Sequence, residues 1–332
     1  MITLYVREQG AGVRRTGQRL IVFKGQQALQ TARLRDLERV VLFGRVEMTS
    51  SASAALLDNG IETILLSYGG KLRGRLAPAD AKNVFLRQTQ FRRYDDMEFR
   101  VRIGSAIVDG KVRNARSLLQ HYAWNHPSTD LKAAIEKLQV ARERVARQTS
   151  IDALLGAEGD AASVYFAALG KMMRTDFVFK TRTRRPPRDP VNALLSFAYT
   201  LLSTEMTGAL AAQGLDPHVG VLHDLDYGRP SLALDLLEEF RQPVADRLAV
   251  SLVNRNVLSR THFDDRGESG VLLNDIGRSR FLEFYHKALE TEFQIAGPKG
   301  ERSCFREIFR RQARLLRKTI EDGTDYIPFS AR

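Results

Sequence analysis

The sequence has little cysteine and little tryptophan: each occurs once among 332 residues, the cysteine as Cys304. A single cysteine excludes a disulfide framework and a thiolate metal cluster within one chain, which is typical of proteins from a reducing cytoplasm. No run of about 18 apolar residues occurs, so we expect no transmembrane helix. The first residues lack the charged and apolar segments of a secretory signal. We therefore predict a cytoplasmic protein that does not contact a membrane.

Several catalytic signatures are also absent. The sequence contains no GxxxxGK[ST] phosphate loop, no GxSxG nucleophile elbow, no HExxH and no CxxC. Gly10 and Gly12 lack the third glycine and the following helix of a dinucleotide-binding loop. These absences argue against a nucleotide triphosphatase, a serine hydrolase and a zinc protease.

Positive charge, in contrast, is in excess. Lysine and arginine number 51 against 39 aspartate and glutamate residues, which gives a net charge of +12. Such an excess favours polyanionic partners, because neutralising phosphates releases counterions. The planar guanidinium of arginine contacts phosphate oxygens two at a time. The composition thus indicates a nucleic-acid partner, although a basic enzyme with another substrate has the same composition.

The residue pattern of the first 82 positions predicts a β-rich domain. Glycines separate short alternating or apolar segments, and one helix is expected at Ser51–Asp58 before Asn59-Gly60. The expected strands are Ile2–Val6, Leu20–Phe23, Arg39–Phe43, Ile61–Leu66 and Lys71–Leu76. We predict a small domain of two packed layers.

From Val84 onward, helical periodicity replaces this pattern. Apolar residues recur at three- and four-residue spacing in Ile103–Tyr122, Leu131–Ala146, Ala161–Met173, Val191–Leu210, Leu232–Val253 and Phe281–Leu289. The boundary is expected near Pro78–Asn83. The predicted fold class is a multidomain α+β protein: a small, sandwich-like β-rich domain over residues 1–82, then a larger all-α domain over residues 83–332.

One candidate site residue is Glu158, which lies between Gly156 and Gly159. We expect a helix to open here, which would put Tyr165 two turns along on the same face. The alternative for Glu158 alone is a solvated acid near the positive end of a helix dipole. A second candidate is His223, which precedes an acidic helix, unlike the other histidines.

The third candidate is that acidic helix, which begins near Pro230. Asp235 and Glu238 are spaced i, i+3 and point to one side of a mostly apolar, buried helix. Two buried like charges repel each other and are poorly solvated, and a bound cation resolves both problems. The alternative is that these acids pair with arginines such as Arg229 or Arg241.

Together, Glu158, His223 and Glu238 offer two carboxylates and one imidazole. This set suits Mg²⁺ or Mn²⁺ with open water positions; the nitrogen favours Mn²⁺, and zinc remains possible. An open cation site beside a basic surface suits phosphodiester chemistry, because the metal polarises a phosphoryl oxygen and activates an attacking hydroxyl. We therefore predict these three residues as metal ligands.

A basic segment lies between the first two candidates. Residues 180–188 carry a run of cations and two prolines, in what we expect to be an exposed connection that lines a phosphate track. The predicted DNA contacts are Arg182, Arg184, Arg185, Arg188 and Tyr165. A second basic stretch, Arg306–Lys318, has helical spacing and is more typical of a solvated helix face.

The sequence resembles a known family at these residues. It resembles the first CRISPR-associated (Cas) protein, the integrase and endonuclease subunit of CRISPR spacer acquisition. The matching stretches are Gly156–Gly159, Arg184–Tyr199, Gly214–Pro217, Gly220–His223 and Gly228–Arg241, with weaker matches at Gly110–Asn114, Asp246-Arg247 and Asn254-Arg255. One departure is Gln242, which stands between Arg241 and Pro243, where the family pattern has proline directly after the arginine.

The resemblance implies the same ligands, Glu158, His223 and Glu238, with Asp235 as an accessory ligand. It also implies a homodimer joined through residues 1–82, a catalytic domain over residues 83–332 and assembly with a small ferredoxin-like second Cas protein. The DNA partners would be a prespacer duplex and a CRISPR repeat, whose phosphates are attacked by the prespacer 3′-hydroxyls. The alternatives are a structure-selective nuclease for branched DNA in repair, a non-catalytic DNA scaffold and a hydrolase of small phosphoesters.

Overall fold

The structure, a computed structural model, describes residues 2–70, 72–76, 83–295 and 301–331. The chain divides into two compact units, Met1–Lys82 and Asn83–Arg332. The expected boundary at Pro78–Asn83 falls mostly on residues outside the described ranges, as does Lys71 of one expected strand. In the described ranges, no helix combines the length and apolarity that a bilayer crossing needs.

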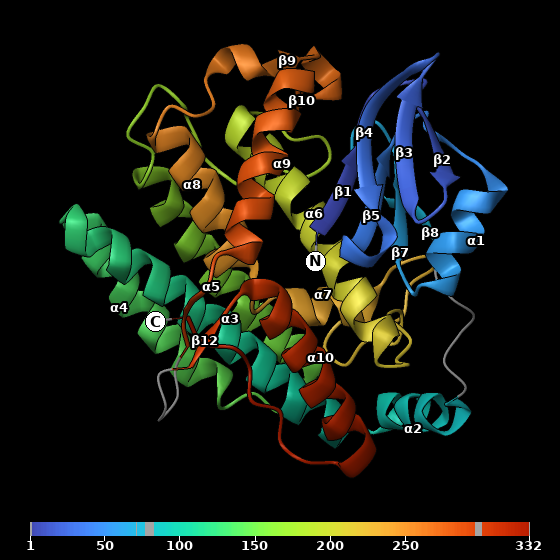
Figure 1. Cartoon of the computed structure of the whole chain (residues 1–332). Coiled ribbons are helices and arrows are strands. Elements are labelled where there is room, and N and C mark those ends of the chain that lie inside the picture. Colours follow the sequence, from blue (N-terminus) through green and yellow to red (C-terminus); the bar gives the residue numbers. More distant parts are fainter. Residues whose placement is uncertain (1, 71, 77–82, 296–300, 332) are drawn as a thin grey trace. The chain divides into compact units, whose positions relative to one another are not determined.

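The first unit is built from two four-stranded sheets and one helix (Figure 1). One sheet has the order β1-β5-β7-β8 and the other β4-β3-β2-β6. The elements are β1 Ile2–Val6, β2 Gly12–Thr16, β3 Arg19–Lys24, β4 Gln27–Arg33, a 3₁₀ turn Leu34–Asp36, β5 Leu37–Phe43, β6 Glu47–Met48, α1 Ser50–Asp58, β7 Glu62–Leu66 and β8 Leu72–Leu76. Strands β1, β5 and β7 run parallel, and β8 pairs antiparallel with β7.

Alternating side chains from both sheets form one core in this unit. In β3, for example, Leu20 and Val22 are buried, whereas the flanking Arg19 and Lys24 are exposed. The core joins Val6, Val13, Val40 and others from the two sheets with Leu56 of α1. The predicted two-layer β-rich domain with one helix is thereby confirmed. Strand β4 was missed because nearly all its side chains are exposed, so no apolar alternation marks it.

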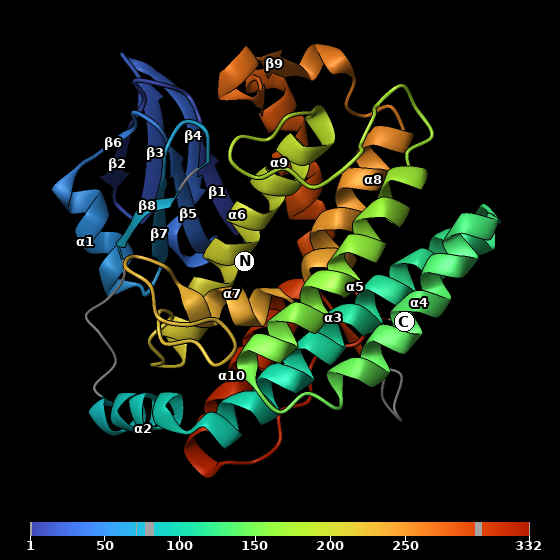
Figure 2. The same cartoon turned by 180° about the vertical axis from the view of Figure 1, so that it is seen from behind.

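The second unit is mostly helical, as predicted. Its helices are α2 Val84–Asp95, α3 Met97–Asn125, α4 Thr129–Val145, α5 Ile151–Lys171, α6 Pro190–Ala212, α7 Ser231–Leu237, α8 Arg247–Asn254, α9 Asp275–Glu290 and α10 Phe305–Asp322. Helices α3, α4 and α5 pack against one another and run alongside each other in both views (Figures 1 and 2). Two short ribbons, β9 Phe263–Asp265 with β10 Val271–Leu273 and β11 Phe293–Gln294 with β12 Arg302–Ser303, show that the unit is not purely helical.

The long helix expected over Leu232–Val253 is broken, which is a correction to the sequence prediction. Helix α7 ends at Leu237, and a π-helical turn, Arg241–Asp246, precedes α8. Pro243 has no N–H and cannot bond the carbonyl of Glu239 four residues earlier. Asn114 of α3 donates its Nδ2 to that carbonyl instead, at 2.8 Å. The break therefore follows from the proline, and a side chain from another helix satisfies the carbonyl that it leaves.

Asn114 also fixes the end of the chain. Its Nδ2 donates to the carbonyl of Phe329 at 2.9 Å, and its Oδ1 accepts from the N–H of Ala331 at 2.9 Å. The side chain is only 1% exposed. Asn114 thus joins three segments of the unit, namely α3, the turn after α7 and residues 329–331, and it satisfies backbone groups that would be unfavourable without a partner.

We expect Asn114→Ala to lower the free energy of unfolding by about 3 kcal/mol, because it leaves several buried backbone groups unsatisfied at about 1–3 kcal/mol each. Urea denaturation measures this. Asn125→Ala is the matched control, since Asn125 lies exposed at the end of the same helix. Equal losses for the two variants would contradict the role of Asn114.

Candidate metal centre

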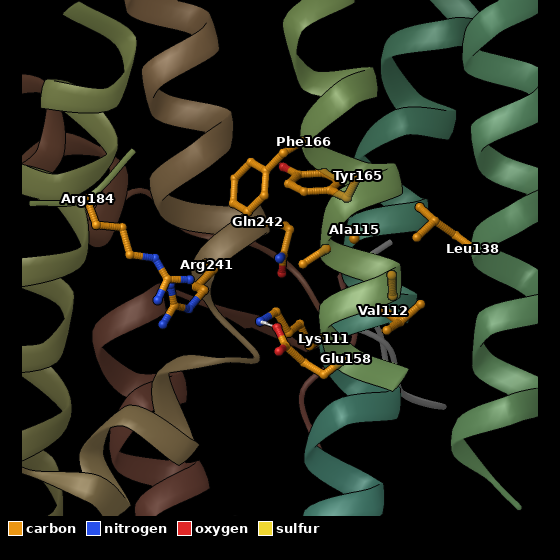
Figure 3. Close-up of a pocket in the computed structure, with 12 residues that line it drawn as sticks. Lys111, Val112, Ala115, Leu138, Glu158, Tyr165, Phe166, Arg184, Arg241 and Gln242 are labelled. Carbon is orange, nitrogen blue, oxygen red and sulfur yellow. Dashed lines mark hydrogen bonds and ion pairs between the residues drawn. The ribbon is translucent and has the colours of Figure 1, made fainter. Parts of the chain in front are cut away.

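Glu158 lies in the middle of α5, not at its start. The helix begins at Ile151, where Ser150 caps it by accepting from the N–H of Ala153 at 3.3 Å. The expectation that a helix opens at Glu158 is therefore wrong, and the end of the helix dipole does not explain this acid. The expected shared face is confirmed: Glu158 and Tyr165 line one pocket, together with Ala161 and Ala162 (Figure 3).

Glu238 is the most buried of the three predicted ligands. It follows the last residue of α7 and is 3% exposed. Its Oε2 lies 2.6 Å from Lys111 Nζ and 2.8 Å from Arg241 Nε. Burial by itself raises the pKa of Glu238, but the charges of Arg241, Lys111 and His223 outweigh burial and lower this pKa to about 2. The carboxylate is therefore ionised at neutral pH although it is enclosed by protein.

Lys111 connects the two acids. Its side chain extends from α3, and its Nζ donates to Glu158 Oε1 (Figure 3). The same Nζ also pairs with Glu238 Oε2. The buried Oε2 atom of Glu238 is thus compensated by two cations, Lys111 and Arg241. A carboxylate oxygen held by positive charge in this way also suits a divalent cation.

The third predicted ligand, His223, is oriented by Asp235. His223 lies in the loop before α7, and its Nδ1 is 2.7 Å from Asp235 Oδ1. Asp235 also accepts from the N–H groups of Val221, Leu222 and His223 at 2.6, 3.1 and 3.0 Å. Because a carboxylate only accepts, Nδ1 of His223 carries the proton and Nε2 is left with its lone pair. The carboxylate–histidine pair is the usual support of a metal-binding imidazole.

The three expected ligands are near one another but not gathered into a cage. Over the described ranges, histidine, cysteine and acidic side chains form no group of three placed to hold one ion. The ammonium of Lys111 lies between the carboxylates of Glu158 and Glu238. In this conformation, therefore, the protein's own cation takes the position between the acids.

A second layer of polar residues lies behind the acids. Asp246 accepts from Tyr165 Oη at 2.7 Å and from Tyr199 Oη at 2.6 Å. Burial raises the pKa of Asp246 to about 6, in spite of these hydrogen bonds. Arg241 lies over the Tyr199 ring at 4.5 Å and is thereby held in place beside Glu238. Sequence reasoning missed Lys111, Tyr199 and Asp246 as parts of the site.

The predicted DNA contacts separate into two groups. Arg184, Arg185 and Arg188 are exposed in the connection between α5 and α6, and Arg184 also lines the pocket that contains Glu158. Arg182 instead donates to Asn192 Oδ1 at 2.8 Å and to Ser196 Oγ at 3.1 Å. Tyr165 is 2% exposed, which leaves it no surface for a direct DNA contact, contrary to our expectation.

The second basic stretch, Arg306–Lys318, falls on α10. Arg306 is 4% exposed and pairs with Glu290 at 2.8 Å, and Arg317 pairs with Glu321 at 3.1 Å. The stretch is therefore part of a helix as interpreted, but Arg306 is buried and paired in it and is not on a solvated face.

Gly220 permits the loop that carries His223 to pack against Asp235. A Cβ at this position would lie 2.5 Å from the His223 carbonyl oxygen and 3.0 Å from Asp235 Oδ2. We expect Gly220→Ala to reduce the free energy of unfolding by about 1–3 kcal/mol through overpacking. Gly156→Ala is the control: a Cβ there meets nothing within 4 Å, and alanine within a helix stabilises by about 0.5–1 kcal/mol. Denaturation midpoints that shift in the same direction for both variants would contradict this account.

Known proteins are similar to this chain in sequence and in fold. The family model described as "CRISPR associated protein Cas1" matches residues 4–287. A CRISPR-associated endonuclease Cas1 of Thermus thermophilus is 36% identical, with 99% of this chain and 97% of that protein covered. A Cas4/Cas1 fusion of Geobacter sulfurreducens is also 36% identical over 96% of this chain, which spans only 58% of the fusion.

Two solved structures have the same fold. A Cas1 protein from Thermotoga maritima superposes with a TM-score of 0.82 at 25% identity, with 100% of both chains covered. A casposase bound to an integration product gives a TM-score of 0.85 at 22% identity, with 98% of this chain and 93% of that chain covered. The resemblance found in the sequence is thereby confirmed: this chain belongs to the Cas1 family of CRISPR-associated endonucleases.

Proposed function

We propose that this protein is a metal-dependent DNA integrase of CRISPR adaptation, which joins prespacer 3′-hydroxyl ends to repeat phosphates. The observation that carries the proposal is the convergence of two acids, from α5 and from the end of α7, on one cationic position. His223 lies near enough to contribute to the low pKa of Glu238. Family membership supplies the DNA substrate, and the site supplies the chemistry.

The donor set fits a divalent cation. Glu158 and Glu238 would provide oxygen ligands, and the Nε2 atom of His223 would provide a nitrogen. The Glu238 carboxylate is buried and ionised, and the groups that neutralise its Oε2 atom are both cations. We propose Mg²⁺ or Mn²⁺ as the ion. When bound, it would polarise a phosphoryl oxygen and activate the attacking hydroxyl.

The residues around the proposed metal site then have separate roles. Asp235 holds His223 through Nδ1, which leaves Nε2 for the metal. Asp235 is therefore a positioning residue in this proposal, in place of its expected role as an accessory ligand. Arg241 keeps Glu238 ionised. Because the nucleophile belongs to the DNA, no side chain forms a covalent intermediate with the substrate.

The exposed arginines of the α5–α6 connection are the proposed phosphate contacts. Arg184 is the residue that links this surface to the pocket of Glu158. Arg182 and Tyr165 act behind the surface, through Asn192 and Asp246 respectively. A DNA strand that follows Arg188, Arg185 and Arg184 would be led toward the two acids.

The assembly is proposed from the family resemblance. Residues 1–82 would join two copies of the chain, residues 83–332 would carry the catalysis, and a small ferredoxin-like second Cas protein would connect the dimers in the cytoplasm. The two ends of one prespacer would then meet two phosphates of one repeat.

We expect strand transfer to depend on Glu158. The protein and its small partner would be mixed with a labelled duplex carrying 3′-hydroxyl ends and a supercoiled plasmid with a repeat array. Label should join the plasmid with Mn²⁺ and not with EDTA, and Glu158→Gln should reduce joining by roughly 100-fold or more, since metal charge stabilisation contributes several kcal/mol.

Asp160→Asn is the matched control, because Asp160 lies two residues farther along α5 in an exposed pair with Arg144. Nicking of the plasmid without joining would favour the structure-selective nuclease, in which water replaces the 3′-hydroxyl. DNA binding without either reaction in the presence of Mn²⁺ would contradict the integrase proposal and favour a scaffold.

A further inference from the structure

Lys111 is a buried lysine in contact with two acids. It is 9% exposed, and its Nζ touches Glu158 Oε1 and Glu238 Oε2. Lysine is almost never this buried unless it is paired. Here the pair is unusual, since one ammonium serves two carboxylates that come from separate helices. The ammonium therefore neutralises two acids and keeps their carboxylates close together, one from α5 and one from the residue after α7.

The position between the acids has the dimensions of a cation site. Ammonium–carboxylate contacts are about 2.7–2.9 Å long, whereas Mg²⁺–oxygen distances are about 2.0–2.1 Å. Replacing the ammonium by Mg²⁺ thus requires each carboxylate to move by less than about 1 Å. Glu158, whose side chain is 22% exposed, has room for such a shift.

Of the two cations at Glu238, Arg241 is the more firmly held, because it also lies over the Tyr199 ring at 4.5 Å. Lysine carries a compact charge on a flexible stem and can change rotamer. Lys111 is therefore the better candidate for exchange with a metal ion.

We propose that the Lys111 ammonium is a stand-in cation, which occupies the metal position in the metal-free protein and moves aside when a divalent ion binds. This inference rests on the proposed metal function of Glu158 and Glu238. It explains how two carboxylates stay close together without metal, because Lys111 removes their repulsion. It also makes the metal affinity a competition, in which every ion bound must displace a protein cation.

The first experiment measures Mn²⁺ affinity and thermal stability in metal-stripped protein. Lys111→Met should bind Mn²⁺ more tightly, by roughly tenfold or more, because the ion no longer competes with a protein cation for the two carboxylates; couplings between two binding events are typically about 5- to 150-fold. Its melting temperature in EDTA should fall, and Mn²⁺ should raise that temperature more than in the unchanged protein.

Arg184→Gln is the matched control for loss of a nearby positive charge. Arg184 lines the same pocket as Lys111 but is exposed. The affinity of the Arg184→Gln variant for Mn²⁺ should change by less than about threefold, because exposed charges are screened by salt. Equal tightening in both variants would overturn the proposal, as would unchanged or weaker binding in Lys111→Met.

A second experiment uses the unchanged protein, so that it does not depend on the folding of a variant. The amine of Lys111 should react slowly with an acetylating reagent in EDTA and faster with Mg²⁺, because the metal displaces it from the acids. Mass spectrometry would follow the modification of this residue. Equal or slower reaction with Mg²⁺ would mean that Lys111 stays between the carboxylates, contrary to the proposal.

Glu158→Ala and Glu238→Ala separate this inference from the proposed function. If both retain normal Mn²⁺ affinity, the metal site itself is wrongly assigned. If both lose Mn²⁺ while Lys111→Met fails to gain affinity, the metal site stands and only the stand-in role of Lys111 is refuted.

Discussion

The centre of the helical unit depends on one buried charge, the carboxylate of Glu238. An isolated ionised carboxylate in such a place is strongly unfavourable, so the surrounding structure must supply positive charge. Lys111 from α3 and Arg241 from the π-turn supply it at 2.6 and 2.8 Å. These two contacts join α3 to the segment that follows α7, and Lys111 extends the connection to Glu158 of α5. The arrangement of three helical elements around the site is thus coupled to the neutralisation of a single group.

The break after α7 gives Glu238 its place. Pro243 prevents a continuous helix, and the π-turn directs Arg241 back toward the acid. Behind it, Asp246 accepts from two tyrosines, and one of these carries Arg241 on its ring. The distortion beside the proposed metal site is therefore supported by hydrogen bonds and stacking from α5 and α6. The contact with Tyr199 holds the charge of Arg241 beside Glu238, whereas, among the described residues, the exposed arginines of the α5–α6 connection have no such support.

Much of the architecture could be predicted from sequence, because it follows from periodicity. Strands such as β3 alternate apolar and polar residues, and long helices such as α6 repeat apolar residues over many turns. Strand β4, whose side chains are nearly all exposed, and the break at Pro243 lie outside such patterns. Within the site, Glu158, His223 and Glu238 were named from residue type and spacing, and from a family resemblance. Lys111 was not, because a lysine distant in sequence has no local signature of the acids that it will contact. Tyr165 was placed on the correct face, but its burial depends on tertiary packing that spacing does not encode.

The central claim is that Glu158 and Glu238 form one cation position, held by Lys111 until a metal takes it. The most direct measurement is anomalous X-ray scattering from crystals of the protein soaked with Mn²⁺. The account predicts a Mn²⁺ peak about 2.0–2.2 Å from oxygens of both glutamates and from His223 Nε2, with the Lys111 ammonium withdrawn from Glu238. A peak at other acids, with the 2.6 Å contact between Lys111 and Glu238 intact, would contradict it.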